Sequence, residues 1–287
     1  MNKEFREIML FIMPLVVLVL VFLLLPILGT FWLSLWRDVT FLPREFIGIN
    51  NYIRLIQDNQ FWNSVRFTLL FAFLSVTFEM IFGMVAALVI HEKFPGRGLM
   101  RGIALLPWAI PSVISARIWQ LMYRYDYGLA NYALHGLTGT SINWLGSSGG
   151  ALFSLVFADV WRTTPFVAII LLAGLQAVPE DLYKQGRIDG ANLVQRLYKI
   201  TLPSIKPVLL VALLFRTIDA LRVFDIIYVI TGGGPGGSTT SISLHSYDYF
   251  LLGDFGYGST VSIALFILAF SISLVYIKLG KFRERVL

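Results

Sequence analysis

Four charged side chains recur at three-residue intervals within an otherwise apolar stretch of the sequence. They are Arg216, Asp219, Arg222 and Asp225, and they alternate in sign. Residues three apart lie on the same side of a helix, so the spacing predicts one ladder of neighbouring opposite charges. Such a ladder is either a neutralised structural feature or the polar wall of a path for a hydrophilic solute, and the pattern leaves both interpretations open.

A second pair of opposite charges has the same spacing in another apolar stretch. Asp159 and Arg162 lie three residues apart, with Trp161 and Phe166 close by. A binding site for a small molecule combines aromatic surface with a few polar groups, and a sugar ring suits such a site. Aromatic residues are also ordinary constituents of membrane helices, so this pair alone does not identify a sugar site.

Signals for catalysis, metal binding and nucleotide binding are missing from the sequence. The three histidines, His91, His135 and His245, have no metal-ligand spacing, and no nucleophile-elbow motif is present. The glycine-rich run 232–237 lacks the Lys-Ser/Thr ending of a phosphate loop, and we expect an external turn there. The chain has no Cys, which excludes disulfides and thiolate sites. We therefore expect no enzyme activity and no cofactor on this chain.

The elements that carry these residues are predicted to be membrane helices. Of the 287 residues, 57% are hydrophobic and 14% charged, with a mean hydropathy of +0.74. A membrane helix needs about 20 mostly apolar residues. Six spans meet this condition, at 8–36, 67–90, 102–123, 151–176, 207–230 and 255–277. Pro107 and Pro111 should bend the third span, which either lines a cavity or is simply bent. The fold class is therefore an all-α integral membrane protein with six transmembrane helices.

Lysine and arginine residues set the expected orientation of the spans. Fourteen of the 23 lie on the side that holds both termini, and all seven lysines are among them. They are Lys3, Arg6, Lys93, Arg97, Arg101, Lys184, Arg187, Arg196, Lys199, Lys206, Lys278, Lys281, Arg283 and Arg285. Positive loops remain in the cytoplasm, which predicts a multi-pass protein of the cell membrane with both termini cytoplasmic. The positive charge forms no single patch, so we expect no nucleic-acid partner.

The cytoplasmic loop 178–203 has the pattern of a helix–turn–helix. Pro179 and the following acidic residues indicate a helix start, and Asp189-Gly190 indicates a turn. Asp189 is predicted to cap a second helix that ends at Pro203. The loop is either an amphipathic linker on the membrane surface or a docking element for another subunit.

Several separated motifs resemble one family of transporters. The loop runs Pro-Glu-Asp-Leu-Tyr (179–183), Arg-Ile-Asp-Gly-Ala (187–191) and Ile-Thr-Leu-Pro (200–203), and it resembles the EAA loop of ABC-importer permeases. The segments 46–52 (FIGINNY), 106–111 (LPWAIP), 214–220 (LFRTIDA) and 231–235 (TGGGP) are similar to the carbohydrate-uptake branch, in particular its MalF-type permeases for trehalose and maltose.

The resemblance implies the type I ABC importer permease fold and a set of partners. The partners would be a second, MalG-type permease, two ATP-binding subunits that hold ATP and Mg²⁺, an extracytoplasmic sugar-binding protein and the lipid bilayer. Residues 1–63 would form the N-terminal span and first external loop, and residues 64–287 a five-helix permease core. The alternatives are an ABC permease for another solute, such as a polyamine or an oligopeptide, and a secondary transporter that works alone.

The resemblance also carries residue roles to this sequence. Within the loop 178–203, it implies contact with the ATPase by Leu182, Lys184, Gly186, Asp189, Gly190 and Ala191. The family has Glu-Ala-Ala where this chain has Lys184-Gln185-Gly186, so the charge at the Glu position is reversed. Docking would then use other contacts or an acidic cleft on the partner. The family's sugar pocket corresponds to Arg162, Thr163, Phe166, Arg216, Asp219, Ala220 and Val223.

Overall fold

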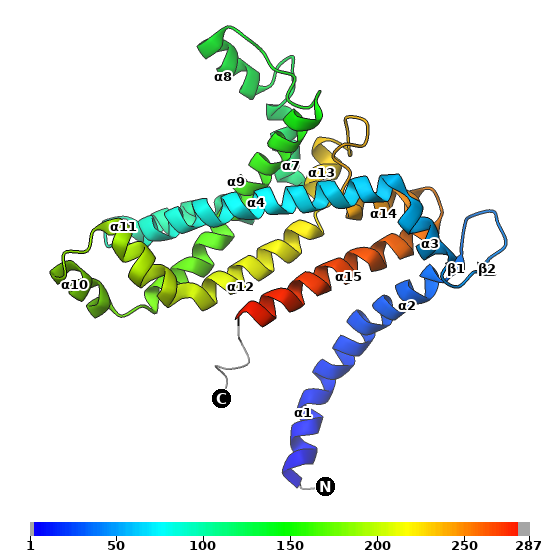
Figure 1. Cartoon of the computed structure of the whole chain (residues 1–287), viewed down its shortest axis with the longest axis horizontal. Helices are drawn as coiled ribbons and strands as arrows, with labels where there is room; N and C mark the ends of the chain where they lie inside the picture. The colour runs from blue at the N-terminus through cyan, green and yellow to red at the C-terminus, as the bar shows by residue number, and fades with distance from the viewer. Residues whose placement is uncertain (1–2, 281–287) are drawn as a thin grey trace. The chain divides into compact units, whose positions relative to one another are not determined.

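The computed structural model describes residues 3–280, with side chains from 9 to 279, and is largely helical (Figure 1). In chain order the helices are α1 (Lys3–Val19), α2 (Leu25–Ser34), α3 (Asn50–Gln57), α4 (Asn59–His91), α5 (Arg97–Ala104), α6 (Leu106–Ala109), α7 (Ser112–Met122), α8 (Leu129–Thr138), α9 (Ser148–Gln176), α10 (Glu180–Ile188), α11 (Leu193–Arg196), α12 (Leu202–Leu221), α13 (Asp225–Ile230), α14 (Ile242–Leu251) and α15 (Phe255–Gly280). The π-helical stretches η1 (Leu20–Leu24) and η2 (Leu197–Thr201) join α1 to α2 and α11 to α12.

Six segments of the described chain correspond to the predicted spans. Five continuous helical stretches are long and apolar enough to cross a membrane, namely Met9–Ser34, Asn59–His91, Ser148–Gln176, Leu193–Leu221 and Phe255–Leu279. The pair Arg97–Ala109 and Ser112–Met122 makes a sixth if it forms one span. This pair is bent by 86° at its break.

The bend in the third span is located at Pro111. A proline forces the residue before it out of the helical region, and Ile110 accordingly has an extended ψ of 131°. Pro107 lies in the first turn of α6, where the missing N–H of proline costs little. The predicted bend is therefore confirmed, and Pro111 rather than Pro107 causes it.

The predicted limits of the fifth span are wrong. Its helix begins at Leu193 and ends at Leu221, residues 222–224 are not helical, and α13 starts at Asp225. The ladder of four charges on one helix is therefore interrupted, because Arg216 and Asp219 belong to α12 whereas Asp225 begins another helix. Pro203 does not end the cytoplasmic helix either, because the chain continues through η2, where the Leu202 N–H donates to the Leu197 carbonyl.

The chain divides into two compact units. One comprises residues 1–62 and 245–267, and the other comprises residues 63–244 and 268–287. The predicted domains were 1–63 and 64–287, and the difference is that residues 245–267 pack with the N-terminal segment. Of the basic residues used to orient the chain, Lys281, Arg283 and Arg285 lie outside the described residues, as do the side chains of Lys3 and Arg6.

The smaller unit contains a short hairpin and helix α3. Strands β1 (Trp36–Arg37) and β2 (Glu45–Phe46) pair antiparallel, with Trp36 opposite Phe46. The buried Asn51 amide on α3 donates to the carbonyl oxygens of Ser34 and Trp36, each at 2.9 Å. These bonds fasten the end of α2 to α3. Within the described chain none of residues 9–33 is buried, as expected for a span that contacts lipid or another subunit.

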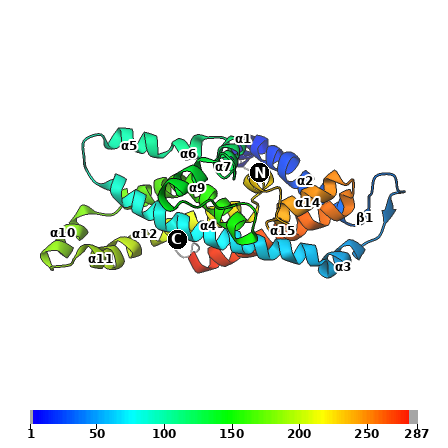
Figure 2. The ribbon, with the colours of Figure 1, turned by 90° about the horizontal axis from the view of Figure 1, so that it is seen from above.

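The larger unit has its core between α4, α9 and α12, which lie side by side in both views (Figures 1 and 2). Ala87, Val167, Leu171, Ile205 and Ala212 are among the buried residues of this cluster. Membrane helices associate through close packing of small residues, since lipid offers no hydrophobic drive between them. Here α4 approaches α9 at a glycine, because a Cβ on Gly83 would lie 2.6 Å from Cγ1 of Val167.

Gly83→Ala is expected to destabilise the chain by about 1–3 kcal/mol, because its methyl group would overpack the contact between α4 and α9. The measurement is thermal unfolding of the detergent-solubilised protein, in which the variant should melt at a lower temperature. Gly102→Ala on α5 is the matched control, because nothing lies within 4 Å of its Cβ position and alanine favours a helix. Equal melting temperatures for the two variants would contradict the proposed packing.

Candidate functional site

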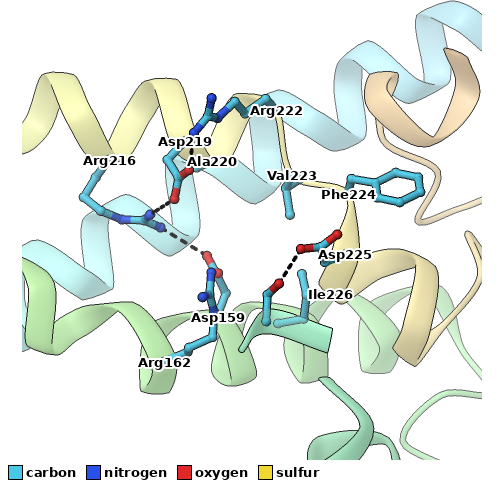
Figure 3. Close-up of a pocket in the computed structure, with 11 residues that line it drawn as sticks. Asp159, Arg162, Arg216, Asp219, Ala220, Arg222, Val223, Phe224, Asp225 and Ile226 are labelled. Atoms are coloured by element: carbon cyan, nitrogen blue, oxygen red, sulfur yellow. Dashed lines mark hydrogen bonds and ion pairs between the residues drawn. The ribbon is translucent and has the colours of Figure 1, made fainter. Parts of the chain in front are cut away.

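A polar cavity of about 220 Å³ lies where α9, α12, α13 and the start of α7 meet (Figure 3). It is placed at the two interrupted spans, next to the break before Ser112 and the non-helical link 222–224. Its lining is Ser112, Asp159, Arg162, Arg216, Asp219, Ala220, Arg222, Val223, Phe224, Asp225 and Ile226. Breaks in spans leave backbone and polar groups that are tolerated where they line a cavity.

Arg216 is the centre of the charged groups behind and around this cavity. Its side chain is 2% exposed, and its Nε and Nη2 donate to the two carboxylate oxygens of Glu79 on α4 at 2.5 and 2.8 Å. Its Nη1 donates to Asp219 at 2.5 Å. A two-point contact of this kind is among the stronger hydrogen-bonded ion pairs in proteins. The pair joins α4 to α12 inside the bundle.

Asp159 and Thr163, one turn apart on α9, complete the cluster. Nη2 of Arg216 lies 3.4 Å from an Asp159 carboxylate oxygen. The Thr163 hydroxyl lies 2.6 Å from both a Glu79 carboxylate oxygen and the Asp159 carbonyl oxygen, and its single hydrogen can be donated to one of them. Charged and polar groups of three spans therefore converge on one buried guanidinium.

The last two charges of the broken ladder have different kinds of partner. Nη2 of Arg222 donates to Asp219 at 3.2 Å, so the first three charges of the ladder stay together. The Ser112 hydroxyl donates to the Asp225 carboxylate, so this residue pairs with α7 instead of the ladder. The Gln120 amide on α7 also donates to the Val229 carbonyl of α13 at 2.6 Å. Helices α7 and α13, which follow the breaks in the two interrupted spans, are thus bonded to each other.

Five of the seven predicted pocket residues line the cavity. Those that line the cavity are Arg162, Arg216, Asp219, Ala220 and Val223. Thr163 and Phe166 are not part of its lining. Thr163 is bound to the buried cluster, and the half-buried Phe166 stacks on Trp108 with ring centroids 5.6 Å apart. Roles in substrate binding remain predictions for all seven residues.

Sequence reasoning singled out Asp159 together with Arg162 but did not include it among the seven pocket residues, and it did not select Glu79 or Ser112. Glu79 is the single charge within the second span, and a lone buried carboxylate is so costly in a membrane that it signals a partner. That signal was present, but the partner is 137 residues away in the chain and no local pattern identifies it. Ser112 could be suspected only from the bend that precedes it.

The cavity is suited to binding more than to catalysis. Three carboxylates (Asp159, Asp219 and Asp225) and three guanidinium groups (Arg162, Arg216 and Arg222) line it, and no histidine does. Among the described residues, no group of three or more metal-ligating side chains is placed to hold a metal ion. Balanced charges of this kind offer many hydrogen-bond donors and acceptors with little net field, which suits an uncharged polar molecule.

The predicted helix–turn–helix in the loop 178–203 is confirmed, with a different cap. Helix α10 ends in a Schellman motif, because the Ala191 N–H donates to the Gly186 carbonyl at 2.8 Å and the Gly190 N–H to Arg187 at 3.1 Å. Gly190 has the left-handed φ of +76° that this motif requires. Asn192, and not Asp189, caps α11, in a capping box with Gln195. Asp189 is instead the C-cap of α10, which ends at Ile188.

The residues predicted to contact an ATPase lie on α10 and the turn that follows it. In both views α10 lies past one end of helices α4, α9 and α12 (Figures 1 and 2). Leu182, Lys184, Asp189 and Gly190 are exposed, Ala191 is half-buried and Gly186 is buried. A Cβ on Gly186 would lie 2.7 Å from Cδ1 of Ile200, so this glycine lets α10 pack closely on η2. Contact with an ATPase remains a prediction.

Two exposed ion pairs lie at the start of α10. Lys184 pairs with Asp181 within the helix, and Lys93 after α4 pairs with Glu180, both at 2.8 Å. The hydrogen bond and positive charge of Lys93 hold the pKa of Glu180 below its ordinary value. A cavity of about 590 Å³ adjoins the loop, and its lining holds four basic residues, Lys93, Lys184, Arg187 and Arg196, against the two carboxylates of Glu92 and Glu180. The lining therefore has an excess of positive charge.

The chain is similar over nearly its whole length to known transport proteins. It is 56% identical to the trehalose/maltose transport system permease protein MalF of Thermococcus litoralis, with coverage of 96% of this chain and 94% of the relative. It is 39% identical to the trehalose transport system permease protein SugA of Mycobacterium tuberculosis, with coverage of 88% and 82%.

A solved structure has the same fold. A chain of a bacterial alginate ABC transporter, crystallised in complex with an alginate pentasaccharide-bound periplasmic protein, matches with a TM-score of 0.85 at 24% identity, over 98% of this chain and 96% of that one. The chain thus has the permease fold of type I ABC importers. The model of the binding-protein-dependent transport system inner membrane component family matches residues 79–279. Together with the close relatives, this match establishes that the chain belongs to that family of multi-pass membrane proteins.

Proposed function

We propose that this chain is the permease subunit of an ATP-driven sugar importer, with a disaccharide such as trehalose or maltose as its substrate. As a member of its family it is a transport component and not an enzyme. The relatives whose names mention these sugars support the substrate class. As the sugar passes through the pocket, it would be bound by Arg162, Arg216, Asp219, Ala220 and Val223. Thr163 and Phe166 would support these residues from outside the lining.

The observation that carries this proposal is the charge balance of the cavity. Three carboxylates and three guanidinium groups line it and offset one another. A polyamine would need an excess of carboxylates, since each ammonium group loses its hydration on binding. A disaccharide instead presents many hydroxyl groups, each able to donate and accept, which the aspartate and arginine side chains can meet in turn.

The size of the cavity supports a second permease subunit. Ligand pockets usually measure about 300–1,000 Å³, whereas this cavity measures about 220 Å³. The present chain therefore supplies one wall of the pathway, and a MalG-type partner supplies the other. A secondary transporter that works alone would need to hold the complete site within one chain.

The driving force comes from partner chains. Two ATP-binding subunits hold ATP and Mg²⁺, no cofactor is needed on this chain, and an extracytoplasmic sugar-binding protein delivers the substrate. Both termini and the loop 178–203 lie in the cytoplasm, where Leu182, Lys184, Gly186, Asp189, Gly190 and Ala191 form the ATPase contact. Closure of the ATPases shifts the permease to its outward-facing state only if α10 makes different contacts in the two states.

Asp219→Ala tests the pocket. The substitution removes a hydrogen-bond acceptor from the cavity but leaves the contact between Arg216 and Glu79 in place, so we expect the complex to assemble. ATP-dependent sugar uptake into proteoliposomes should fall about tenfold or more, the usual effect of losing a hydrogen bond to a charged group. Asp126→Ala, at an exposed carboxylate in the loop before α8, is the control and should transport normally. Wild-type uptake by Asp219→Ala would contradict a substrate role for this pocket.

The substrate itself is best identified through the binding protein. Retention of labelled trehalose and maltose on the purified cognate binding protein, with spermidine and an oligopeptide as competitors, separates the substrate classes. We expect retention of a disaccharide and no displacement by the competitors. Retention of spermidine or the peptide alone would replace the sugar proposal with one of its alternatives.

A further inference from the structure

Asp159 has a buried carboxylate with unused hydrogen-bonding capacity. Its side chain is 6% exposed and lines the cavity, close to Arg162 and opposite Arg216 (Figure 3). Among the described residues, its carboxylate accepts one hydrogen bond, from Arg216 Nη2 at 3.4 Å. A carboxylate has about four acceptor positions, and leaving them unmade in a buried site is costly. This side chain is therefore arranged for a donor that enters the cavity.

Glu79 explains why Arg216 does not satisfy Asp159. Glu79 is completely buried on α4, does not line the cavity, and takes the Nε and Nη2 edge of the guanidinium at 2.5 and 2.8 Å. Asp219 takes Nη1. Four of the five N–H groups of Arg216 are engaged in this arrangement, and Asp159 receives only the longest of the contacts. Glu79 thus competes with Asp159 for the same cation.

The number of carboxylates around Arg216 also indicates that Asp159 is available to a ligand. Glu79, Asp159 and Asp219 all contact Arg216, and Arg222 contacts only Asp219, so three carboxylates share the Arg216 guanidinium while the lining of the cavity as a whole stays balanced. A design that served only to neutralise Arg216 would need fewer carboxylates. The additional acceptor faces the cavity, where hydroxyl groups of a sugar would be its donors.

We propose that Asp159 is a specificity-determining acceptor for a substrate hydroxyl, and that Glu79 is a positioning residue that keeps Asp159 available by holding Arg216 away from it. The proposal rests on the proposed sugar-import function and adds two residues to its site. Without Glu79, Arg216 swings toward Asp159 and closes a full ion pair, which removes the acceptor from the substrate. Glu79 and Asp159 therefore act on one and the same contact.

The test is a double-mutant cycle in complexes reconstituted with the binding protein and the ATPases. Glu79→Gln and Asp159→Asn should each lower sugar uptake about tenfold, and the double variant should be no worse than either single one, because both remove the same contact. Each variant should also change the trehalose-to-maltose uptake ratio. A merely structural role would lower uptake of the two sugars in proportion. Ser75→Ala, at a buried hydroxyl one turn earlier on α4, is the matched control and should behave as wild type.

Several results would overturn the proposal. If the double variant loses uptake by the product of the two single losses, Glu79 does not act through Asp159. If Glu79→Gln fails to assemble, Asp159→Asn decides the test alone, because it leaves the pair of Glu79 and Arg216 in place. A wild-type uptake rate and a wild-type trehalose-to-maltose ratio in Asp159→Asn would then refute the role of Asp159. Failure of the wild-type complex to import either sugar would instead refute the proposed function, so the two failures are distinguishable.

Discussion

Arg216→Ala is expected to lower the free energy of unfolding of the chain by about 3–5 kcal/mol, the usual cost of removing one partner of a buried ion pair. The loss leaves Glu79, which has no exposed surface, without its cation and beside the Asp159 carboxylate. The measurement is the yield and melting temperature of the detergent-solubilised complex. Both should drop well below those of Asp219→Ala, whose carboxylate is 44% exposed.

The double variant Glu79→Leu/Arg216→Met is the control for this prediction. Buried ion pairs can often be replaced by apolar side chains of similar volume with little loss, or even a gain, of stability. The double variant should therefore assemble and melt nearly as the wild type does, yet fail to transport sugar. If Arg216→Ala alone melts like the wild type, the pair of Glu79 and Arg216 is not the link between α4 and α12 that its geometry indicates.

Gly190→Val is expected to uncouple ATP hydrolysis from sugar transport. At φ +76°, Gly190 is in the left-handed region, which costs an L-residue about 1–2 kcal/mol and is worst for a β-branched side chain. Nothing lies within 4 Å of its Cβ position, so the effect comes from backbone strain and not from a clash. The strain breaks the Schellman turn that fixes the direction between α10 and α11. ATPase activity of reconstituted complexes should then no longer rise with the sugar-loaded binding protein.

Gly190→Asn separates backbone strain from any other effect of the side chain. Asparagine adopts the left-handed conformation far more readily than valine, so this variant should retain most of the stimulated ATPase activity. Basal ATPase activity reports assembly and should be similar in both variants. Normal stimulation of the valine variant would show that the turn at Gly190 does not transmit motion between the subunits.

The sequence is most informative about the spans and the cytoplasmic loop, because both depend on local patterns. Long apolar stretches identified all six candidate spans, and Pro111 marked the bend in the third. The turn at Gly190 was visible from Asp-Gly alone. Asn192 was overlooked as the cap although the Gln three residues later completes a capping box, which is a signal that sequence reasoning could have used.

The charged cluster was harder to predict because its contacts are non-local. The spacing of Arg216 and Asp219 correctly places them together, but nothing in Arg222, Val223 and Phe224 announces that α12 ends at Leu221. Asp225 consequently pairs with Ser112, which is 113 residues distant. The partner of Arg216 on α4 depends on how α4, α9 and α12 pack, and no single-helix periodicity contains that information.

The reversed charge at Lys184 has a local partner in the structure. Lys184 pairs with Asp181 one turn earlier, at 65% and 79% exposure of the two side chains. An exposed pair of this kind contributes little stability, so Lys184 can exchange Asp181 for an acidic group of a docked ATPase without a large cost. Both alternatives from the sequence, docking through other contacts and an acidic cleft on the partner, are compatible with this geometry and stay predictions.

The most direct test is sugar uptake by proteoliposomes that contain this chain, with and without its partner subunits. We expect uptake of labelled trehalose or maltose only when the second permease, the ATPases and the sugar-loaded binding protein are present and ATP and Mg²⁺ are supplied on the ATPase side. Uptake by the chain alone, independent of ATP and driven by a proton or sodium gradient, would contradict the importer function proposed for it.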